Sequence, residues 1–330
     1  MTAENNSLFL QLFSRWDTGW YVAIAQAWYP TLPAPAWAFS PLYPFTIRIL
    51  VSLGLQPLFA AWLIATTAGL TCVPVFQKVA EAYLPAKRTR TTTILYFLLP
   101  PVLLFSGISY SEPLFLLLSL LAWRYHLSGA DLKSNLAAAL SSLTRNYGVL
   151  IVIPLVYDCV RRNELKRLAF APIPILSSVG WLLYAYAWTG DLLAPLDARS
   201  RMADPTPIAI MRAVSDIMKG HLGSIMVLVH YWWVFILGIP ALLFVLVLAK
   251  RALLIDRSLG IYTFVSILAI FIFGFSVTST TSFLRYFTFL FPVGLPLYTQ
   301  KRWLLTIMVS AFLILNYLMW LGFLVGGYSP

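Results

Sequence analysis

The side chains able to do acid–base or phosphate chemistry are few, because only 11% of the 330 residues are charged. Asp17 stands among tryptophans and tyrosines in the stretch FSRWDTGWYVAIAQAWYP. Glu112 lies between two apolar runs, in GISYSEPLF, and Arg145 and Arg285 lie inside or beside apolar runs. A carboxylate can act as a general base and a guanidinium can hold a phosphate. These four residues are therefore the candidates for a reactive site.

Each acid also has a structural interpretation. Asp17 begins a predicted helix, where it could cap the free amide groups and interact with the helix dipole. Glu112 precedes Pro113, which suits a first helical position, so it could serve the same purpose. The functional alternative is that Glu112 and Tyr110 bind the hydroxyls of a polyhydroxylated substrate. The residues alone leave both interpretations open.

The two arginines need partners for an energetic reason. A cation among apolar residues costs about 2.5–3.5 kcal/mol to insert into a membrane. Arg145 therefore either pairs with an acid or a helix C-terminus, or binds an anion. Arg285 lies near the end of its apolar run, so it could bind an anion or extend toward the membrane surface.

The composition predicts the class of protein that must position these residues. Hydrophobic residues make up 60% of the chain, in several runs approaching the roughly 20 residues that a membrane-crossing helix needs. We expect an all-α, polytopic membrane protein with one domain, in which residues 1–56 form an outer-face segment and 57–330 form the bundle. The eight expected crossings begin near Pro57, Thr92, Pro113, Ala169, Ile225, Leu259, Leu284 and Trp303.

The net charge of +11 is concentrated in alternate connections, such as QKVAEAYLPAKRTR and DCVRRNELKR. Positive residues stay on the cytoplasmic side of membranes, so this pattern predicts which connections are cytoplasmic and places Asp17 and Glu112 on the opposite face. The charge thus follows from topology and does not indicate nucleic-acid binding.

One apolar stretch does not fit the alternation. The segment 132–162 has basic flanks at both ends but only about one helix's worth of apolar residues. We expect a re-entrant pair of half-length helices that reverses at the sequence RNYG and carries Arg145 at its tip. Pro-punctuated segments at 38–55 and 205–220 are expected to form interfacial helices on the outer face.

No metal or cofactor site is predicted. The sequence has no Asp-x-Asp motif, no Gly-rich phosphate loop and no cluster of His and Cys with metal-ligand spacing. A soluble nucleotide-sugar substrate held by Mg²⁺ is therefore not supported. A lipid-borne phosphate bound by arginines within the membrane is compatible with the residues present.

Four segments, in order, resemble the PIG-V-type mannosyltransferases. RWDTGWYVAIAQAWYP with AFSPLYPFTIRIL is similar to the Trp-Asp opening of that family, and SGISYSEPLF to its Tyr-Ser-Glu segment. SSLTRNYGVLIVIPL resembles its Thr-Arg-x-x-Gly segment, and LRYFTFLFP resembles its late Arg-Tyr helix. Two departures stand out: the family has a complete crossing before the Trp-Asp motif, and Thr18 follows the motif here.

The resemblance implies a GT-C fold and transfer of mannose from a polyprenyl or dolichyl phosphate on the extracytosolic face. It implies that Asp17 is the catalytic residue. We expect Asp17 to act as general base, with Arg145 and Arg285 binding the donor phosphate. The expected substrate-binding residues are Trp16, Trp20, Tyr43, Tyr110, Glu112, Asn146 and Tyr286.

Two other functions remain open at this stage. A transporter or flippase of lipid-linked sugars would use similar arginines and aromatic surfaces, but would need a path open alternately to both faces. An inactive membrane scaffold is the third possibility. The expected location is the plasma membrane of a bacterium or the endoplasmic reticulum membrane of a eukaryote. The expected partners are the lipid-linked donor, a membrane-proximal acceptor and the bilayer. Nucleic acid is not expected as a partner.

Overall fold

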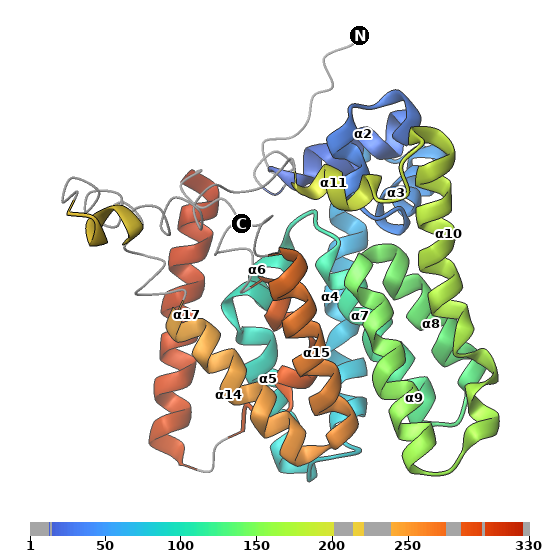
Figure 1. The fold of residues 1–330 in the computed structure, drawn as a ribbon. Helices are drawn as coiled ribbons and strands as arrows, with labels where there is room; N and C mark the ends of the chain where they lie inside the picture. Colours follow the sequence, from blue (N-terminus) through green and yellow to red (C-terminus); the bar gives the residue numbers. More distant parts are fainter. Residues whose placement is uncertain are drawn as a thin grey trace.

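The computed structural model describes residues 13, 15–200, 214–220, 239–274, 285–298 and 301–325 (Figure 1). Over these ranges the chain is helical, with no strand, which confirms the expected all-α class. The α-helices are α2 (Asp17–Ala27), α3 (Leu42–Ser52), α4 (Pro57–Ala80), α5 (Ala86–Leu98), α6 (Pro100–Gly107), α7 (Glu112–Leu127), α8 (Asp131–Thr144), α9 (Val152–Arg161), α10 (Pro172–Thr189), α11 (Ala194–Ser200), α14 (Ile239–Ile255), α15 (Arg257–Gly274) and α17 (Arg302–Val325). The short 3₁₀ helices are η1 (Tyr29–Thr31), η2 (Ala34–Ala38), η3 (Asn146–Ile151), η4 (Leu165–Phe170) and η7 (Phe291–Gly294).

Fewer described helices are long enough to cross a membrane than the eight expected. Three qualify by length and composition, Pro57–Ala80, Leu165–Thr189 and Arg302–Leu324, or four if the bent pair α6–α7 is one span. The apolar runs are interrupted instead of continuous. Pro100 follows the break between α5 and α6, and α6 and α7 are bent by 110°. The predicted crossing from Leu284 is wrong for its described part, because residues 285–298 form one helical turn and the 3₁₀ helix η7 instead of a long helix. The predicted crossing from Ile225 lies mostly outside the described residues.

An aromatic layer built by α2, η1, η2 and α3 covers one end of the bundle, the upper end in Figure 1. Its core includes Tyr29, Trp37 and Tyr43, packed against Trp181 of α10 and the start of α4. The expected interfacial helix within 38–55 forms as α3. Of the second expected interfacial segment, only 214–220 is described, and it contains a helical turn. This layer fixes the direction in which α2 begins.

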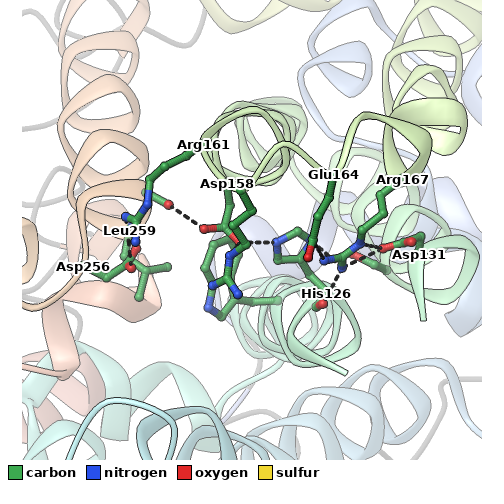
Figure 2. A network of polar contacts seen from close by, with 12 residues as sticks. His126, Asp131, Asp158, Arg161, Glu164, Arg167, Asp256 and Leu259 are labelled. Carbon is green, nitrogen blue, oxygen red and sulfur yellow. Dashed lines mark hydrogen bonds and ion pairs between the residues drawn. The ribbon is translucent and has the colours of Figure 1, made fainter. Parts of the chain in front are cut away.

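The re-entrant pair is present as α8 and α9, both in the lower half of Figure 1. A polar network joins the start of α8 to the end of α9 (Figure 2). Arg167 contacts Asp131 at 2.8 Å, and the His126 side chain at the end of α7 lies 2.9 Å from Asp158 of α9. Because the pair begins and ends at the same end of the bundle, the predicted reversal is correct.

The reversal depends on a close backbone approach at Gly148. The Arg145 amide donates to the carbonyl of Ser141 (3.1 Å), and the Gly148 amide donates to the carbonyl of Arg145 (2.7 Å). A Cβ atom at Gly148 would overlap the backbone of Ser141 and Ser142. Only glycine therefore lets η3 fold back against α8 and hold Arg145 at the tip.

Gly148→Ala is expected to lower the thermal unfolding temperature of the detergent-solubilised protein, because overpacking costs about 1–3 kcal/mol. The matched control is Gly180→Ala in α10, where an added Cβ meets nothing within 4 Å. That control should leave the unfolding temperature unchanged or raise it slightly, since Ala favours helix. Equal unfolding temperatures for the Gly148 variant and the wild type would contradict this account of the turn.

Candidate active site

Four charged residues from distant parts of the chain meet at the end of the bundle that α2 and α3 cover. Asp17 is the first residue of α2, and Glu112 is the first residue of α7. Arg145 lies between α8 and η3, and Arg285 begins the described segment 285–298. Glu112 is 14 residues from His126 along α7, about 21 Å of helix rise, so this site and the network of Figure 2 lie at opposite ends.

The four charges alternate in sign along a chain of ion pairs. Arg145 Nη1 lies 2.6 Å from Glu112 Oε1, and Arg285 Nε lies 2.9 Å from the same oxygen. Arg285 Nη1 also reaches Asp17 Oδ2 at 3.4 Å. Glu112 therefore bridges both arginines, and Arg285 connects Glu112 to Asp17.

Burial differs sharply within this cluster. The side chains of Glu112, Arg285 and Arg145 are 0%, 3% and 7% exposed, whereas that of Asp17 is 26% exposed. A buried ion without a partner is strongly unfavourable, so the two guanidinium groups need the acids beside them. Asp17 is the one member of the cluster that a molecule from outside can readily reach.

Glu112 retains unused hydrogen-bonding capacity. Its Oε1 is within ion-pair distance of both guanidinium groups, but neither contact has hydrogen-bond geometry. Its Oε2 has no hydrogen-bond partner among the described residues. The ion pairs nevertheless attract Glu112 to both arginines, because the attraction between charges depends less on angle than a hydrogen bond does.

Hydroxyl groups extend the network around the charges. Ser111 Oγ accepts from Arg145 Nη1 at 3.2 Å and lies 2.8 Å from the hydroxyl of Tyr21. Burial raises the pKa of Tyr21, and the charge of Glu112 raises it further, so this phenol stays neutral. Arg285 Nη2 donates to the hydroxyl of Tyr286 at 2.8 Å.

Aromatic faces line both guanidinium groups. Tyr286 lies between them, with its ring centroid 4.6 Å from Arg145 and 4.8 Å from Arg285. Tyr147 lies 5.4 Å from Arg145, and Tyr110 lies 5.4 Å from Arg285. Such cation–π contacts hold each guanidinium plane in a defined orientation.

The capping interpretation of the two acids is wrong. The cap positions are occupied by Trp16 and Ser111, neither of which caps through its side chain. The Asp17 carboxylate instead forms an ion pair with Arg285, and the Glu112 carboxylate forms ion pairs with Arg145 and Arg285. Both acids still lie in a first helical turn, where the helix dipole favours negative charge.

The remaining predicted site residues fall into two groups. Tyr110 and Tyr286 line the charged cluster, whereas Asn146 accepts a hydrogen bond from Ser40 at 2.8 Å beside it. Tyr43 is fully buried and its hydroxyl donates to the carbonyl of Ala61 (2.8 Å), so the structure does not place it where it could bind a substrate, contrary to the expectation.

The two expected tryptophans pack within the protein. Trp20 stacks on Phe39 at 6.0 Å between ring centroids, and Trp16 packs edge-on against Phe323 at 5.1 Å. Trp16 is nevertheless 36% exposed. Neither contact prevents part of the indole from meeting a ligand.

Residues absent from the sequence prediction also belong to the cluster. Sequence spacing could have identified Tyr21 and Tyr147 as members of the cluster. Tyr21 lies four positions after Asp17, and Tyr147 lies two positions after Arg145. Ser111 directly precedes Glu112. Within the described part of the chain, no group of three or more His, Cys, Asp or Glu residues could hold a metal ion.

The chain is similar to known proteins over part or most of its length. The family model described as Mannosyltransferase (PIG-V) matches residues 2–163, a range that includes Asp17, Glu112 and Arg145 but not the segment around Arg285. GPI mannosyltransferase 2 from Yarrowia lipolytica (strain CLIB 122 / E 150) is 28% identical over 165 residues, 49% of this chain and 45% of that protein.

A solved structure shows the fold. The crystal structure of ArnT from Cupriavidus metallidurans bound to undecaprenyl phosphate aligns with a TM-score of 0.55 and 14% identity, over 93% of this chain and 61% of that chain. The chain thus spans less than two thirds of either relative. The fold is of the GT-C type found in integral membrane proteins, as expected. Residues 2–163 are thus similar to the PIG-V mannosyltransferase family, and the fold of the described chain is similar to that of ArnT.

Proposed function

We propose that this protein is an integral membrane glycosyltransferase that moves a hexose from a polyprenyl or dolichyl phosphate to an acceptor hydroxyl. Its similarity to the PIG-V mannosyltransferases supports mannose as the hexose. The observation that carries the proposal is the juxtaposition of one accessible carboxylate, Asp17, with two buried guanidinium groups, Arg145 and Arg285. A general base and an anion-binding pair side by side are what a transfer with a phosphate leaving group requires.

In this mechanism the Asp17 carboxylate takes the proton from the acceptor hydroxyl. The acceptor oxygen forms a bond to the anomeric carbon of the sugar as the bond from that carbon to the phosphate oxygen breaks. The bonding electrons stay on the lipid phosphate, whose negative charge grows during the step. Arg145 and Arg285 stabilise that charge most strongly when it is fully formed.

Glu112 receives a different role from the one expected. With no exposed surface and with both arginines beside it, Glu112 is better placed to be their counter-ion than a ligand of sugar hydroxyls. Glu112 keeps these two buried cations paired. A donor phosphate would share the two guanidinium groups with Glu112, so that neither the buried cations nor the buried carboxylate would lack a partner of opposite charge.

The donor and the side of the membrane are supported by two further observations. ArnT binds undecaprenyl phosphate, which supports a polyprenyl-phosphate donor for a chain of the same fold. The site lies at the end of the bundle opposite the network around Asp158, and that network belongs to the basic connections. The positive-inside pattern therefore supports a multi-pass protein whose site faces away from the cytosol.

The purified protein in liposomes, supplied with radiolabelled polyprenyl-phosphate mannose and a mannosylated phosphatidylinositol acceptor, tests the proposal. We expect label to appear in the acceptor together with an equal amount of polyprenyl phosphate. Movement of intact donor between leaflets without bond cleavage would instead indicate a flippase. Neither cleavage nor movement would indicate a scaffold.

Asp17→Asn is expected to lower kcat about 100- to 10,000-fold, the usual contribution of a general base, while leaving the donor KM nearly unchanged. Asparagine keeps the shape and an oxygen that Arg285 can contact, so the protein should still fold. The control is Asp191→Asn, an exposed residue after α10. Wild-type transfer by a folded Asp17→Asn variant would exclude the base assignment.

The ion-pair network predicts a stability pattern. Glu112→Gln or Arg145→Gln alone leaves a buried charge short of a partner, a loss of about 3–5 kcal/mol. The double variant removes both charges, so its loss should be smaller than the sum of the two single losses, by a coupling of about 0.5–3 kcal/mol.

Thermal unfolding of the detergent-solubilised variants measures this coupling. The exposed pair Lys78–Glu81, substituted in the same way, should show almost none. Additive effects of the Glu112 and Arg145 substitutions would contradict the bridging role of Glu112.

A further inference from the structure

The last described helix, α17, stands at one side of the bundle (Figure 1) and packs against α5 and α6. Most of its side chains face outward: Ile307, Leu313, Ile314, Leu315, Tyr317, Leu318, Leu321 and Leu324 are exposed. Phe312, Asn316 and Phe323 are buried, at a spacing that places them on one face. The helix therefore presents one narrow stripe to the rest of the protein.

The middle of the stripe is anchored where α5 breaks. The Asn316 side-chain amide donates to the carbonyl of Leu98, at 2.8 Å. The residues that follow include Pro100 and Pro101, which have no amide hydrogen to offer that carbonyl. This bond fixes the position of α17 along the axis of α6. Gly107, at the end of α6, has no Cβ atom and so leaves space for the Trp320 ring.

The end of the stripe contacts the segment before Asp17. The Trp320 ring packs edge-on against Phe13, with centroids 5.6 Å apart, and Phe323 packs edge-on against Trp16 at 5.1 Å. Phe323 has no exposed surface. These contacts join the far end of the chain to residues next to the proposed base.

The segment that α17 contacts has a constrained backbone. Trp16 has φ of 49°, a left-handed value that a non-glycine residue rarely adopts. Such a conformation persists only when its surroundings hold it. The Ser109 amide donates to the carbonyl of Phe13 (3.1 Å), and the Thr18 hydroxyl donates to the carbonyl of Ser109 (3.1 Å), which hold one side. The aromatic end of α17 holds the other side.

We propose that α17 is a positioning element for the reaction: Trp320 and Phe323 hold Phe13 and Trp16 in place so that Asp17 is directed at Arg285. Their ring contacts with this part of the chain are to Phe13 and Trp16, and both act through these two residues. The inference rests on the proposed function for its kinetic consequence. The matched family range ends at residue 163, well before α17.

The kinetic test compares three variants of the full chain. Phe323→Ala is expected to lower kcat at least about tenfold with the donor KM within about threefold, because a small misplacement of a reacting group slows chemistry more than binding. Phe323→Leu, which keeps most of the buried volume, should recover most of the rate. Leu321→Ala, on the exposed face of the same helix, should behave as wild type.

A second measurement does not depend on activity. Thermal unfolding of Trp16→Ala, Phe323→Ala and the double variant should show non-additive effects if the two rings support each other. Additive effects would overturn the inference whatever the enzyme does. Coupling together with a kcat unchanged by Phe323→Ala would also overturn it, leaving the proposed function intact. If the two substitutions are coupled but the wild-type protein transfers no sugar, the proposed function and the kinetic role are both refuted. The stabilising contact between Trp16 and Phe323 would still stand.

Discussion

Two guanidinium groups are buried in an apolar helical bundle, and their need for counter-ions constrains the rest of the site. Glu112 meets this need by lying within 3 Å of both Arg145 and Arg285. Its position requires the sharp bend between α6 and α7, and that of Arg145 requires the reversal at Gly148. The helix breaks that shorten the apolar runs are thus the features that bring the charges together.

The same charge balance accounts for the proposed chemistry. The cluster contains two positive and two negative groups, so their formal charges balance. A lipid phosphate entering beside the arginines replaces part of the attraction that Glu112 and Asp17 supply. Binding of the donor would then change the contact between Arg285 and Asp17.

Some parts of the site were predictable because charges are rare in this sequence. Asp17, Glu112, Arg145 and Arg285 stood out against an apolar background, and the mismatch of basic flanks around 132–162 predicted the re-entrant pair correctly. Tyr43 was misassigned because an aromatic residue that packs in a core and one that stacks on a ligand have the same sequence pattern.

Other features depend on contacts that no local pattern encodes. Among the described residues, fewer helices are long enough to cross a membrane than hydropathy predicts, because a run such as α5–α6 appears continuous in hydropathy although Pro100 and Pro101 divide it. The contact of Trp16 with Phe323 joins residues more than three hundred positions apart. The bridging of two arginines by Glu112 likewise depends on three separate segments. Spacing cannot reveal such pairings, because tertiary packing determines them.

The binding of polyprenyl phosphate by the Glu112→Gln/Arg145→Gln double variant tests the central claim most directly. This variant removes one cation together with its counter-ion, so its fold should be retained. Titration followed by the ³¹P resonance of the lipid should show binding at least about tenfold weaker than in the wild type, since a charge-assisted contact to the phosphate is lost. Equal affinity in a folded double variant would show that Arg145 does not hold the lipid phosphate.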